Sequence, residues 1–249
     1  MNNSNNFSNR YKIIMNIIVT GASRGIGYDV VLEFSKSRDN RIIAIARDYD
    51  KLIELQKKCF ENYQNKIEIV KFDITTDVIH NNELLNVLKE IETVDIFINN
   101  AGILINKKFE NLSQEDWSLT FATNVFGPIN LIKLIYPKLK NSGFAHIVNI
   151  SSIGGLERSK KFSGLSAYSA SKAALINLTE CMAEEFLEDN IFCNCLSLGA
   201  INTQMFKEAF PSYNAEISSA EISKFICDFS KKYRKFFNGK VIPIAVSTP

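Results

Sequence analysis

The sequence lacks the features that mark membrane proteins and nucleic-acid-binding proteins. None of the apolar runs in its 249 residues approaches the roughly eighteen residues needed to span a bilayer. The formal net charge of +2 is too small to indicate a nucleic-acid partner or a membrane surface. The first fourteen residues are rich in Asn and Ser and contain no apolar core segment. We therefore expect no signal peptide, a disordered tail over residues 1–14 and a cytoplasmic protein, with Met15 as a second candidate translation start.

The cysteines also lack the spacing of a disulfide framework or a metal site. Cys193 and Cys195 stand two positions apart, but no cluster of His or Cys lies near them in the sequence. Two thiols alone do not make a zinc site. We expect free, buried thiols in a reducing compartment and no bound metal. The five cysteines are Cys59, Cys181, Cys193, Cys195 and Cys227.

The chain is organised around Met15–Gly27, where a short apolar run leads through three glycines into a segment of helical spacing. Glycines let the backbone approach a pyrophosphate closely, and the unpaired amides of a helix N-terminus bind anions. The spacing Gly-x3-Gly-x-Gly differs from the common dinucleotide fingerprint, and an ordinary strand-to-helix turn is the alternative. The full string Thr-Gly-Ala-Ser-Arg-Gly-Ile-Gly resembles the cofactor loop of the short-chain dehydrogenase/reductase family, in its short single-domain branch. The resemblance implies that the cofactor is bound by Gly21, Ser23, Arg24, Gly25, Ile26 and Gly27.

Strand and helix patterns alternate along the rest of the chain. No repeat, low-complexity linker or Pro/Gly-rich boundary follows residue 14, so residues 15–249 are predicted to form one NAD(P)-binding catalytic domain. The alternation predicts a Rossmann-like, doubly wound α/β fold: a seven-stranded parallel sheet in the order 3-2-1-4-5-6-7, with helices on both faces. The predicted strands lie at 17–19, 41–46, 66–72, 94–98, 144–150, 191–196 and 241–246. The predicted helices lie at 28–35, 49–60, 83–91, 113–140 and 165–189, with two more and a lid within 203–235.

Arg47 directly follows the second predicted strand, where units that bind NAD carry an acid for the ribose 2′-hydroxyl. A cation suits the 2′-phosphate of NADP instead. In the resembling family, basic residues at the positions of Arg24 and Arg47 accompany NADP(H), which is the predicted cofactor. The alternative makes Asp48 the ribose acid and gives NAD(H), although Asp48 also fits as the N-cap of the next helix.

Further cofactor contacts follow from the resemblance alone. Asp73 is expected beside the adenine ring, although a turn aspartate is also typical there. The string Asn-Asn-Ala-Gly after the fourth strand matches the family and implies contact with the ribose and nicotinamide. After the sixth strand Leu198 replaces the family's usual Pro. The residues placed on the cofactor in this way are Asp73, Ile74, Asn100, Ala101, Gly102, Gly199, Ile201 and Thr203.

Two Tyr-x3-Lys pairs occur, Tyr136/Lys140 and Tyr168/Lys172, and each puts both side chains on one helix face. Tyr136 sits late in its helix, and no serine-tipped strand leads to it. Tyr168 opens its helix and follows Ser152, at the end of the fifth strand, so a loop can bring both onto one carbonyl. We therefore predict that Tyr168 is catalytic and contacts the cofactor together with Lys172.

The chemistry of these residues suits carbonyl reduction. Hydride transfer to a ketone needs a proton donor at the developing alkoxide, and a free tyrosine titrates near 10. Lys172 and the positive nicotinamide ring are expected to lower the pKa of Tyr168, while Ser152 donates a hydrogen bond to the substrate oxygen. Asn124 is a polar residue among apolar ones, and the matching Asn of the family bends the helix and holds a water in a proton relay. The resemblance therefore implies the catalytic set Asn124, Ser152, Tyr168 and Lys172.

The favoured function is an NADP(H)-dependent oxidoreductase that acts on the carbonyl/alcohol pair of a small molecule. The alternative is a redox-sensing protein that binds NADP(H) without turnover, which would not need the four catalytic groups. A nucleotide-sugar epimerase of the longer branch is disfavoured by the chain length and the glycine spacing.

Substrate and assembly are less clearly marked in the sequence. Arg158, Lys160 and Lys161 hint at an anionic substrate, such as a 3-oxoacyl thioester or a sugar nucleotide. Apolar residues downstream could line a pocket or pack on the core. Family members are mostly dimers or tetramers, so we expect a homodimer or homotetramer built on the helices at 113–140 and 165–189. The apolar residues are Met205, Phe206, Phe210 and Tyr213.

Overall fold

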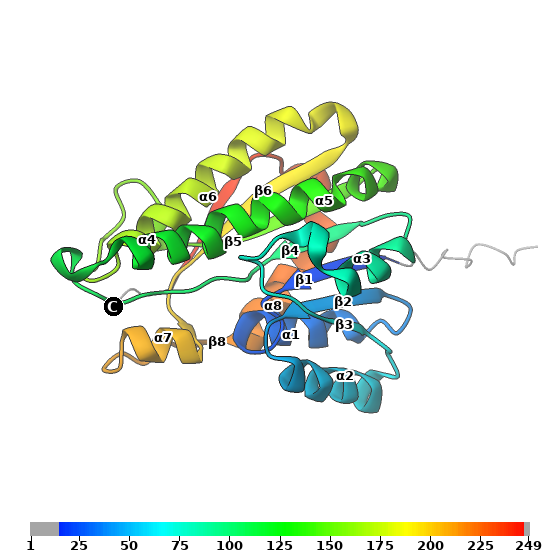
Figure 1. Ribbon diagram of the computed structural model, residues 1–249, viewed down its shortest axis with the longest axis horizontal. Helices are drawn as coiled ribbons and strands as arrows, with labels where there is room; N and C mark the ends of the chain where they lie inside the picture. The colour runs from blue at the N-terminus through cyan, green and yellow to red at the C-terminus, as the bar shows by residue number, and fades with distance from the viewer. Residues whose placement is uncertain (1–14, 247–249) are drawn as a thin grey trace, which may run out of the picture.

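The computed structural model describes residues 15–246, so the expected disorder of residues 1–14 lies outside the described residues. Seven parallel strands form one sheet in the order β3-β2-β1-β4-β5-β6-β9 (Figure 1). The predicted order is confirmed, because β9 is the seventh strand of this sheet along the chain. The strands are β1 Asn16–Thr20, β2 Arg41–Ala46, β3 Glu68–Lys71, β4 Ile96–Asn99, β5 Ala145–Ser152, β6 Ile191–Leu198 and β9 Val241–Ile244.

Helices cover both faces of the sheet, because successive strand side chains point to opposite sides. Ile17 and Val19 of β1 pack in one apolar cluster with α1, α2 and α8, whereas Ile18 packs in a second cluster with α3, α5 and α6. Figure 1 shows α5 and α6 on one side of the sheet and α1 and α2 on the other. The helices are α1 Gly25–Ser35, α2 Tyr49–Tyr63, α3 Asn82–Lys89, α5 Gly127–Ser142, α6 Ser166–Glu185 and α8 Ser219–Asp228.

The predicted helix at 113–140 is not a continuous α-helix. It begins with α4 (Gln114–Phe121), capped by Ser113, and passes through a π-helical turn at Ala122–Phe126 before α5. A Cβ on Gly127 would lie 2.5 Å from the Ile74 carbonyl oxygen, so the chain passes very close to the loop after β3 here. π-turns of this kind are frequent at functional sites.

A short two-stranded sheet, which the sequence pattern did not predict, follows β6. Its strands are β7 (Ile201–Asn202) and β8 (Ile217–Ser218), with α7 (Gln204–Ala209) between them. Figure 1 shows α7 lying apart from the helices that cover the sheet. The remaining short turns are 3-10 helices at Val78–His80, Phe109–Asn111, Ile153–Gly155, Leu187–Asp189 and Arg234–Phe236, and a π-turn at Phe229–Tyr233.

Within the described part of the chain, no helix is long and apolar enough to cross a membrane.

Candidate active site

The carboxyl ends of several parallel strands open into one cavity of about 550 Å³, the usual place for a ligand in such folds. All the predicted cofactor residues line this cavity except Gly27, and all the predicted catalytic residues line it except Asn124. The predicted residues in the wall are Gly21, Ser23, Arg24, Gly25, Ile26, Arg47, Asp73, Ile74, Asn100, Ala101, Gly102, Ser152, Tyr168, Lys172, Gly199, Ile201 and Thr203.

The glycine loop has the form of an anion cradle. Gly21 and Gly25 have φ of 68° and 58°, a backbone conformation that favours glycine. Arg24, the N-cap of α1, makes no side-chain capping bond, so the first amides of the helix have no cap. A Cβ on Gly25 would meet nothing closer than Thr203, at 3.5 Å. Uncapped amides beside glycines in the wall of a cavity fit the pyrophosphate of a dinucleotide.

Gly27 does not line the cavity, and its role is to let α1 pack closely against the glycine loop. The Asn100 side-chain amide donates to the carbonyl oxygens of Thr20 and Gly21, at 3.0 and 3.3 Å. The Thr20 hydroxyl accepts in turn from the backbone amides of Asn100 and Ala101, at 3.1 and 3.0 Å. A Cβ on Gly27 would lie 2.4 Å from the Gly21 carbonyl oxygen and 2.5 Å from the Asn100 amide nitrogen. Only glycine allows α1 to approach this cross-linked loop so closely.

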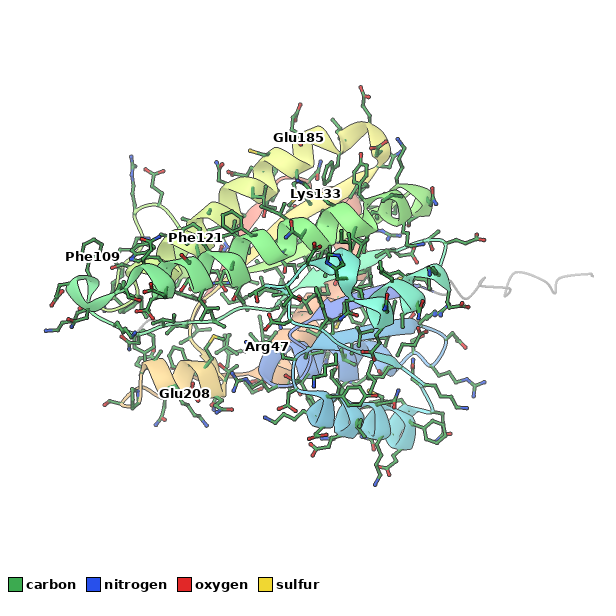
Figure 2. All side chains as sticks on the ribbon, in the orientation of Figure 1. Arg47, Phe109, Phe121, Lys133, Glu185 and Glu208 are labelled. Atoms are coloured by element: carbon green, nitrogen blue, oxygen red, sulfur yellow. The ribbon has the colours of Figure 1, made fainter. Side chains whose placement is uncertain are left out.

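Two arginines from separate segments reach the end of the cavity beyond the glycine loop. The Arg47 guanidinium (Figure 2) lies 3.7 Å from the Asp73 carboxylate, and 61% of the Arg47 side chain is exposed. Asp73 also forms a turn, since its carboxylate accepts from the amide and hydroxyl of Thr75, at 2.9 and 2.8 Å. Arg24 donates to the side-chain oxygen of Gln204, at 3.2 Å. Both cations are in reach of an anionic ligand in the cavity.

Asp48 is the N-cap of α2, the role that the sequence analysis gave it beside the alternative of a ribose acid. Its carboxylate accepts from the Lys51 amide at 3.2 Å, and that bond, with the nearby Lys51 ammonium, lowers the pKa of Asp48. Lys51 lines the cavity as well and was missed by the sequence reasoning. The sequence did offer a signal for this contact, because Lys51 is a basic residue in the first turn of the helix that follows Arg47.

Tyr168 and Lys172 stand one turn apart in α6 and face the cavity. The Lys172 ammonium lies 5.8 Å from the centre of the Tyr168 ring and donates to the Ile150 carbonyl oxygen at 2.9 Å. The Ser152 hydroxyl interacts with the Tyr168 phenol and accepts from a backbone amide of the following turn. A Cβ on Gly155 would lie 2.7 Å from the backbone of Lys172, so glycine lets the tip of β5 press against α6.

Burial shifts the pKa of both groups away from the charged form. It raises the pKa of Tyr168 to about 12, with the Ser152 hydroxyl acting in the opposite direction. It lowers the pKa of Lys172 to about 8. In the chain by itself desolvation dominates the pKa of Tyr168, and Ser152 is the group that opposes it. The expectation that Lys172 and a bound nicotinamide ring together lower this pKa stays a prediction.

Asn124 lies behind the wall, in the π-turn. Its side-chain oxygen accepts from the Ile103 amide at 2.9 Å, and its amide donates to the Ile103 carbonyl and the Ser171 hydroxyl, at 3.0 and 2.9 Å. A Cβ on Gly102 would lie 3.2 Å from the Asn124 oxygen and 3.4 Å from the Lys172 ammonium. The two side chains thus border one small space, and a proton relay between them stays a prediction.

The far end of the cavity is apolar. Met205, Phe206 and Phe210 line it, whereas Tyr213 lies outside the wall with its ring 5.8 Å from that of Phe206. Other wall residues here were missed, because apolar side chains in loops carry no local signal that separates a pocket from the core. The missed apolar residues are Ile103, Leu104, Ile153, Phe162 and Leu165, and the polar Ser169 of α6 was missed as well.

Leu198, which stands where the resembling family has Pro, continues β6 and pairs with Ser152 on one side and Ile244 on the other. The next amide, that of Gly199, donates to the Ile244 carbonyl at 2.8 Å. Strand β9 therefore supports this turn in place of a proline ring.

Residues 15–246 contain no cluster of three or more side chains suited to a metal ion, and the five cysteines are free.

A parallel sheet in this order, with a glycine loop and an uncapped helix at its carboxyl edge, defines a dinucleotide-binding α/β protein of the Rossmann type. The sequence profile of the family described as short chain dehydrogenase matches residues 15–214. The chain belongs to this family.

Individual relatives and solved structures are between 22% and 32% identical to it over the aligned residues. The chain is 32% identical to an acetoacetyl-CoA reductase of Rhizobium meliloti over 190 residues, covering 76% of this chain and 75% of the relative. It is 30% identical to a 3-oxoacyl-[acyl-carrier-protein] reductase of Chlamydia trachomatis over 191 residues, 76% of this chain and 75% of the relative. Among solved structures, ElxO with NADP bound superposes with a TM-score of 0.81 at 26% identity, covering 93% of this chain and 97% of that one. L-Sorbose reductase from Gluconobacter frateurii, complexed with NADPH and L-sorbose, has a TM-score of 0.82 at 22% identity over 93% and 95% of the chains.

Proposed function

We propose that the protein is an NADP(H)-dependent oxidoreductase that interconverts a carbonyl and an alcohol on a small molecule. One observation carries the proposal: the phenol of Tyr168, the ammonium of Lys172 and the hydroxyl of Ser152 line the same cavity as the glycine loop. A protein that only held a nucleotide would have no use for a proton donor at this position.

The roles follow from the chemistry of each group. The bound cofactor supplies the hydride. Ser152 polarises the substrate carbonyl with a hydrogen bond, and Tyr168 donates the proton to the developing alkoxide. Lys172 holds the nicotinamide ribose and stabilises the phenolate that forms. Asn124 fixes the backbone at Ile103 and borders the space through which Lys172 exchanges a proton with solvent.

The preference for NADP(H) over NAD(H) is supported by three cations in the wall at the ribose end of the cavity, Arg24, Arg47 and Lys51, which outnumber the two carboxylates there, those of Asp48 and Asp73. The solved relative with NADP bound agrees with this assignment. Exchanging Arg47 for Asp should weaken NADPH binding by roughly 10- to 100-fold, because a charge-assisted contact to the 2′-phosphate is replaced by repulsion. NADH binding should not weaken. Lys57→Asp, the same charge change on the exposed side of α2, is the control, and equal NADPH affinity in all three proteins would exclude the assignment.

Turnover is tested by following NADPH absorbance with a panel of 3-oxoacyl thioesters, sugars and steroids. Two of these classes include the substrates named for relatives, acetoacetyl-CoA and L-sorbose. Oxidation of NADPH that depends on a carbonyl compound is the expected result. Tight NADPH binding with no turnover across the panel would support the sensor alternative and contradict the proposed reaction.

We also propose a homodimer or homotetramer built on α4, α5 and α6. Large apolar side chains are exposed there, including Leu119 and Phe126, at 47% and 56% of their surface. Figure 2 labels Phe121 at the end of α4 and Phe109 on the turn that precedes this helix. Sedimentation should give a mass above that of one chain, and Phe126→Glu should lower it. With five free cysteines, the cytoplasm remains the proposed location.

A further inference from the structure

The cavity is divided into a charged end and an apolar end. Apart from Lys172, its charged wall residues all belong to the glycine loop or to the segments after β2 and β3. The opposite end is formed by the loops after β4 and β5, the start of α6, and α7. Its apolar side chains are Ile103, Leu104, Ile153, Phe162, Leu165, Met205, Phe206 and Phe210. The polar wall residues on the same elements are Ser169, beside Ser152 and Tyr168, and Gln204, the first residue of α7.

Aromatic rings build the outer part of this apolar end. The ring of Phe162 meets that of Phe210 edge-on at 5.2 Å, and Phe210 meets Phe206 at 5.1 Å. Phe162 lies on the loop that leads into α6, whereas the other two lie on α7 and at its C-cap. Rings from two separate segments therefore meet in the wall of the cavity that Tyr168 also lines.

The apolar wall is held in place by polar contacts behind it. The Asn106 side-chain amide donates to the Ala209 carbonyl at 3.1 Å, and the Lys107 amide donates to the Gly164 carbonyl at 3.1 Å. Gly164 has φ of 87°, and a Cβ there would fall 2.1 Å from the Asn106 oxygen. The loop after β4 thus ties α7 to the segment that carries Phe162.

The cations that hinted at an anionic substrate do not serve this end of the cavity. The Lys161 ammonium donates to the carbonyls of Gly154 and Leu156, at 2.7 and 2.6 Å, and to the Ser159 hydroxyl at 2.9 Å. These bonds use all three of its N–H groups. Arg158 is 90% exposed and lies beside Glu157. None of the three cations stands in the wall, although the Lys160 ammonium lies 5.2 Å from the centre of the Phe162 ring.

We propose that the substrate is an uncharged ketone or aldehyde whose remaining part is apolar, and preferably an aromatic or other ring. This rests on the proposed function, because Ser152 and Tyr168 define the reacting end. A carboxylate or phosphate in the apolar end would lose its hydration among wall side chains that include no cation. A sugar would bury several hydroxyls against rings that offer no hydrogen bonds. Aromatic rings instead gain from edge-on contacts with Phe162 and Phe210.

Matched substrates test this on the full chain with saturating NADPH: benzylacetone, its para-carboxylate, L-sorbose and acetoacetyl-CoA. Benzylacetone should have the highest kcat/KM, roughly a hundredfold above its carboxylate. Phe210→Ala should lower kcat/KM for benzylacetone at least ~10-fold without changing the NADPH Kd. Phe210→Arg should narrow the gap between benzylacetone and the carboxylate. Phe236→Ala removes an aromatic ring that is 65% exposed. This control variant should keep the wild-type kcat/KM for benzylacetone and for its carboxylate.

The two proposals fail in different ways. Turnover that favours L-sorbose or acetoacetyl-CoA would overturn the apolar substrate while leaving the oxidoreductase in place. If no carbonyl compound is reduced, the proposed reaction is wrong. Calorimetric titration of benzylacetone into the NADP complex then tests the proposed apolar pocket separately. Binding that Phe210→Ala abolishes and Phe236→Ala preserves supports the apolar pocket. Absence of binding to the wild-type chain overturns it.

Discussion

The two Tyr-x3-Lys pairs are the same motif in two environments. Tyr136 and Lys140 lie in α5 and share one carboxylate. It belongs to Asp189, in the 3-10 turn that follows α6. The Tyr136 hydroxyl donates to Asp189, and the Lys140 ammonium lies 2.6 Å from it. That carboxylate raises the pKa of both Tyr136 and Lys140.

Within residues 15–246, no carboxylate shifts the pKa of Tyr168 or Lys172. Burial, instead of a counter-charge, sets their pKa values, about 12 for Tyr168 and about 8 for Lys172. The first pair is closed by its ion pair and cross-links two helices. The second pair faces a cavity and is not joined to a carboxylate, and its side chains make hydrogen bonds only with the Ile150 carbonyl and the Ser152 hydroxyl among the described contacts.

The largest expected effect distinguishes the two tyrosines. Tyr168→Phe should lower kcat by roughly 10²- to 10⁴-fold, the usual contribution of a general acid, with NADPH binding retained. Tyr136→Phe should leave kcat nearly unchanged. Steady-state kinetics and a fluorescence titration of NADPH measure both. Equal losses in the two variants would mean that the comparison is wrong.

The next effect concerns Lys172. Its ammonium loses a proton as the pH rises through about 8, so its bond to the cofactor ribose should weaken. We expect the NADPH Kd to rise by up to about tenfold between pH 7 and 9. Lys172→Met should bind less tightly and show a flatter pH profile, whereas Lys140→Met should keep the wild-type profile. If the NADPH Kd of Lys172→Met still rises between pH 7 and 9 as in the wild type, another group is responsible for the pH dependence.

A third prediction concerns His146, whose pKa is shifted mainly by burial, as those of Tyr168 and Lys172 are, but at the opposite end of the sheet. It is fully buried in β5, beside the Ser230 carbonyl and the Asn194 side chain, at 3.1 and 2.9 Å. Burial lowers its pKa to about 4, so the unfolded chain binds the proton more tightly. The unfolding free energy should therefore fall by ~2 kcal/mol from pH 7 to pH 5 through this residue.

Urea unfolding at the two pH values measures this loss, with His146→Phe as the comparison. The variant should be less stable at pH 7 but should lose less stability on acidification. An identical loss in both proteins would show that His146 titrates normally.

The smallest effect is expected from Asp189→Asn. The pKa of Asp189 is lowered by Lys140 and Tyr136, so its stabilising contribution exists above the unfolded pKa near 4 and is lost as the pH falls through the folded value. The exposed pair should shift the melting temperature only slightly at pH 7. A spectrophotometric titration should show one tyrosine pKa moving down toward 10, and turnover should not change. A loss of turnover would give the Tyr136 pair a role that its geometry does not support.

The strongly patterned elements could be predicted from sequence. The strand at Arg41–Ala46 has the predicted bounds, because an apolar run between polar turns has few alternatives in a parallel sheet. The π-turn around Asn124 and the pairing of β7 with β8 were not predicted. Both depend on contacts with distant segments, such as the close passage of Gly127 past Ile74, and two-residue strands have no measurable period.

The sequence by itself determined the order of strands and helices, the glycine loop and the residue types available for catalysis, because hydrophobic period and backbone freedom are local properties. It also marked two tyrosine–lysine pairs. Only the tertiary structure decided which pair faces a cavity, that burial rather than Lys172 dominates the pKa of Tyr168, and that Lys161 is bonded to its own loop. Desolvation, counter-charges and the walls of a pocket come from residues far apart in the chain, so they exist only once the sheet and its helices have packed.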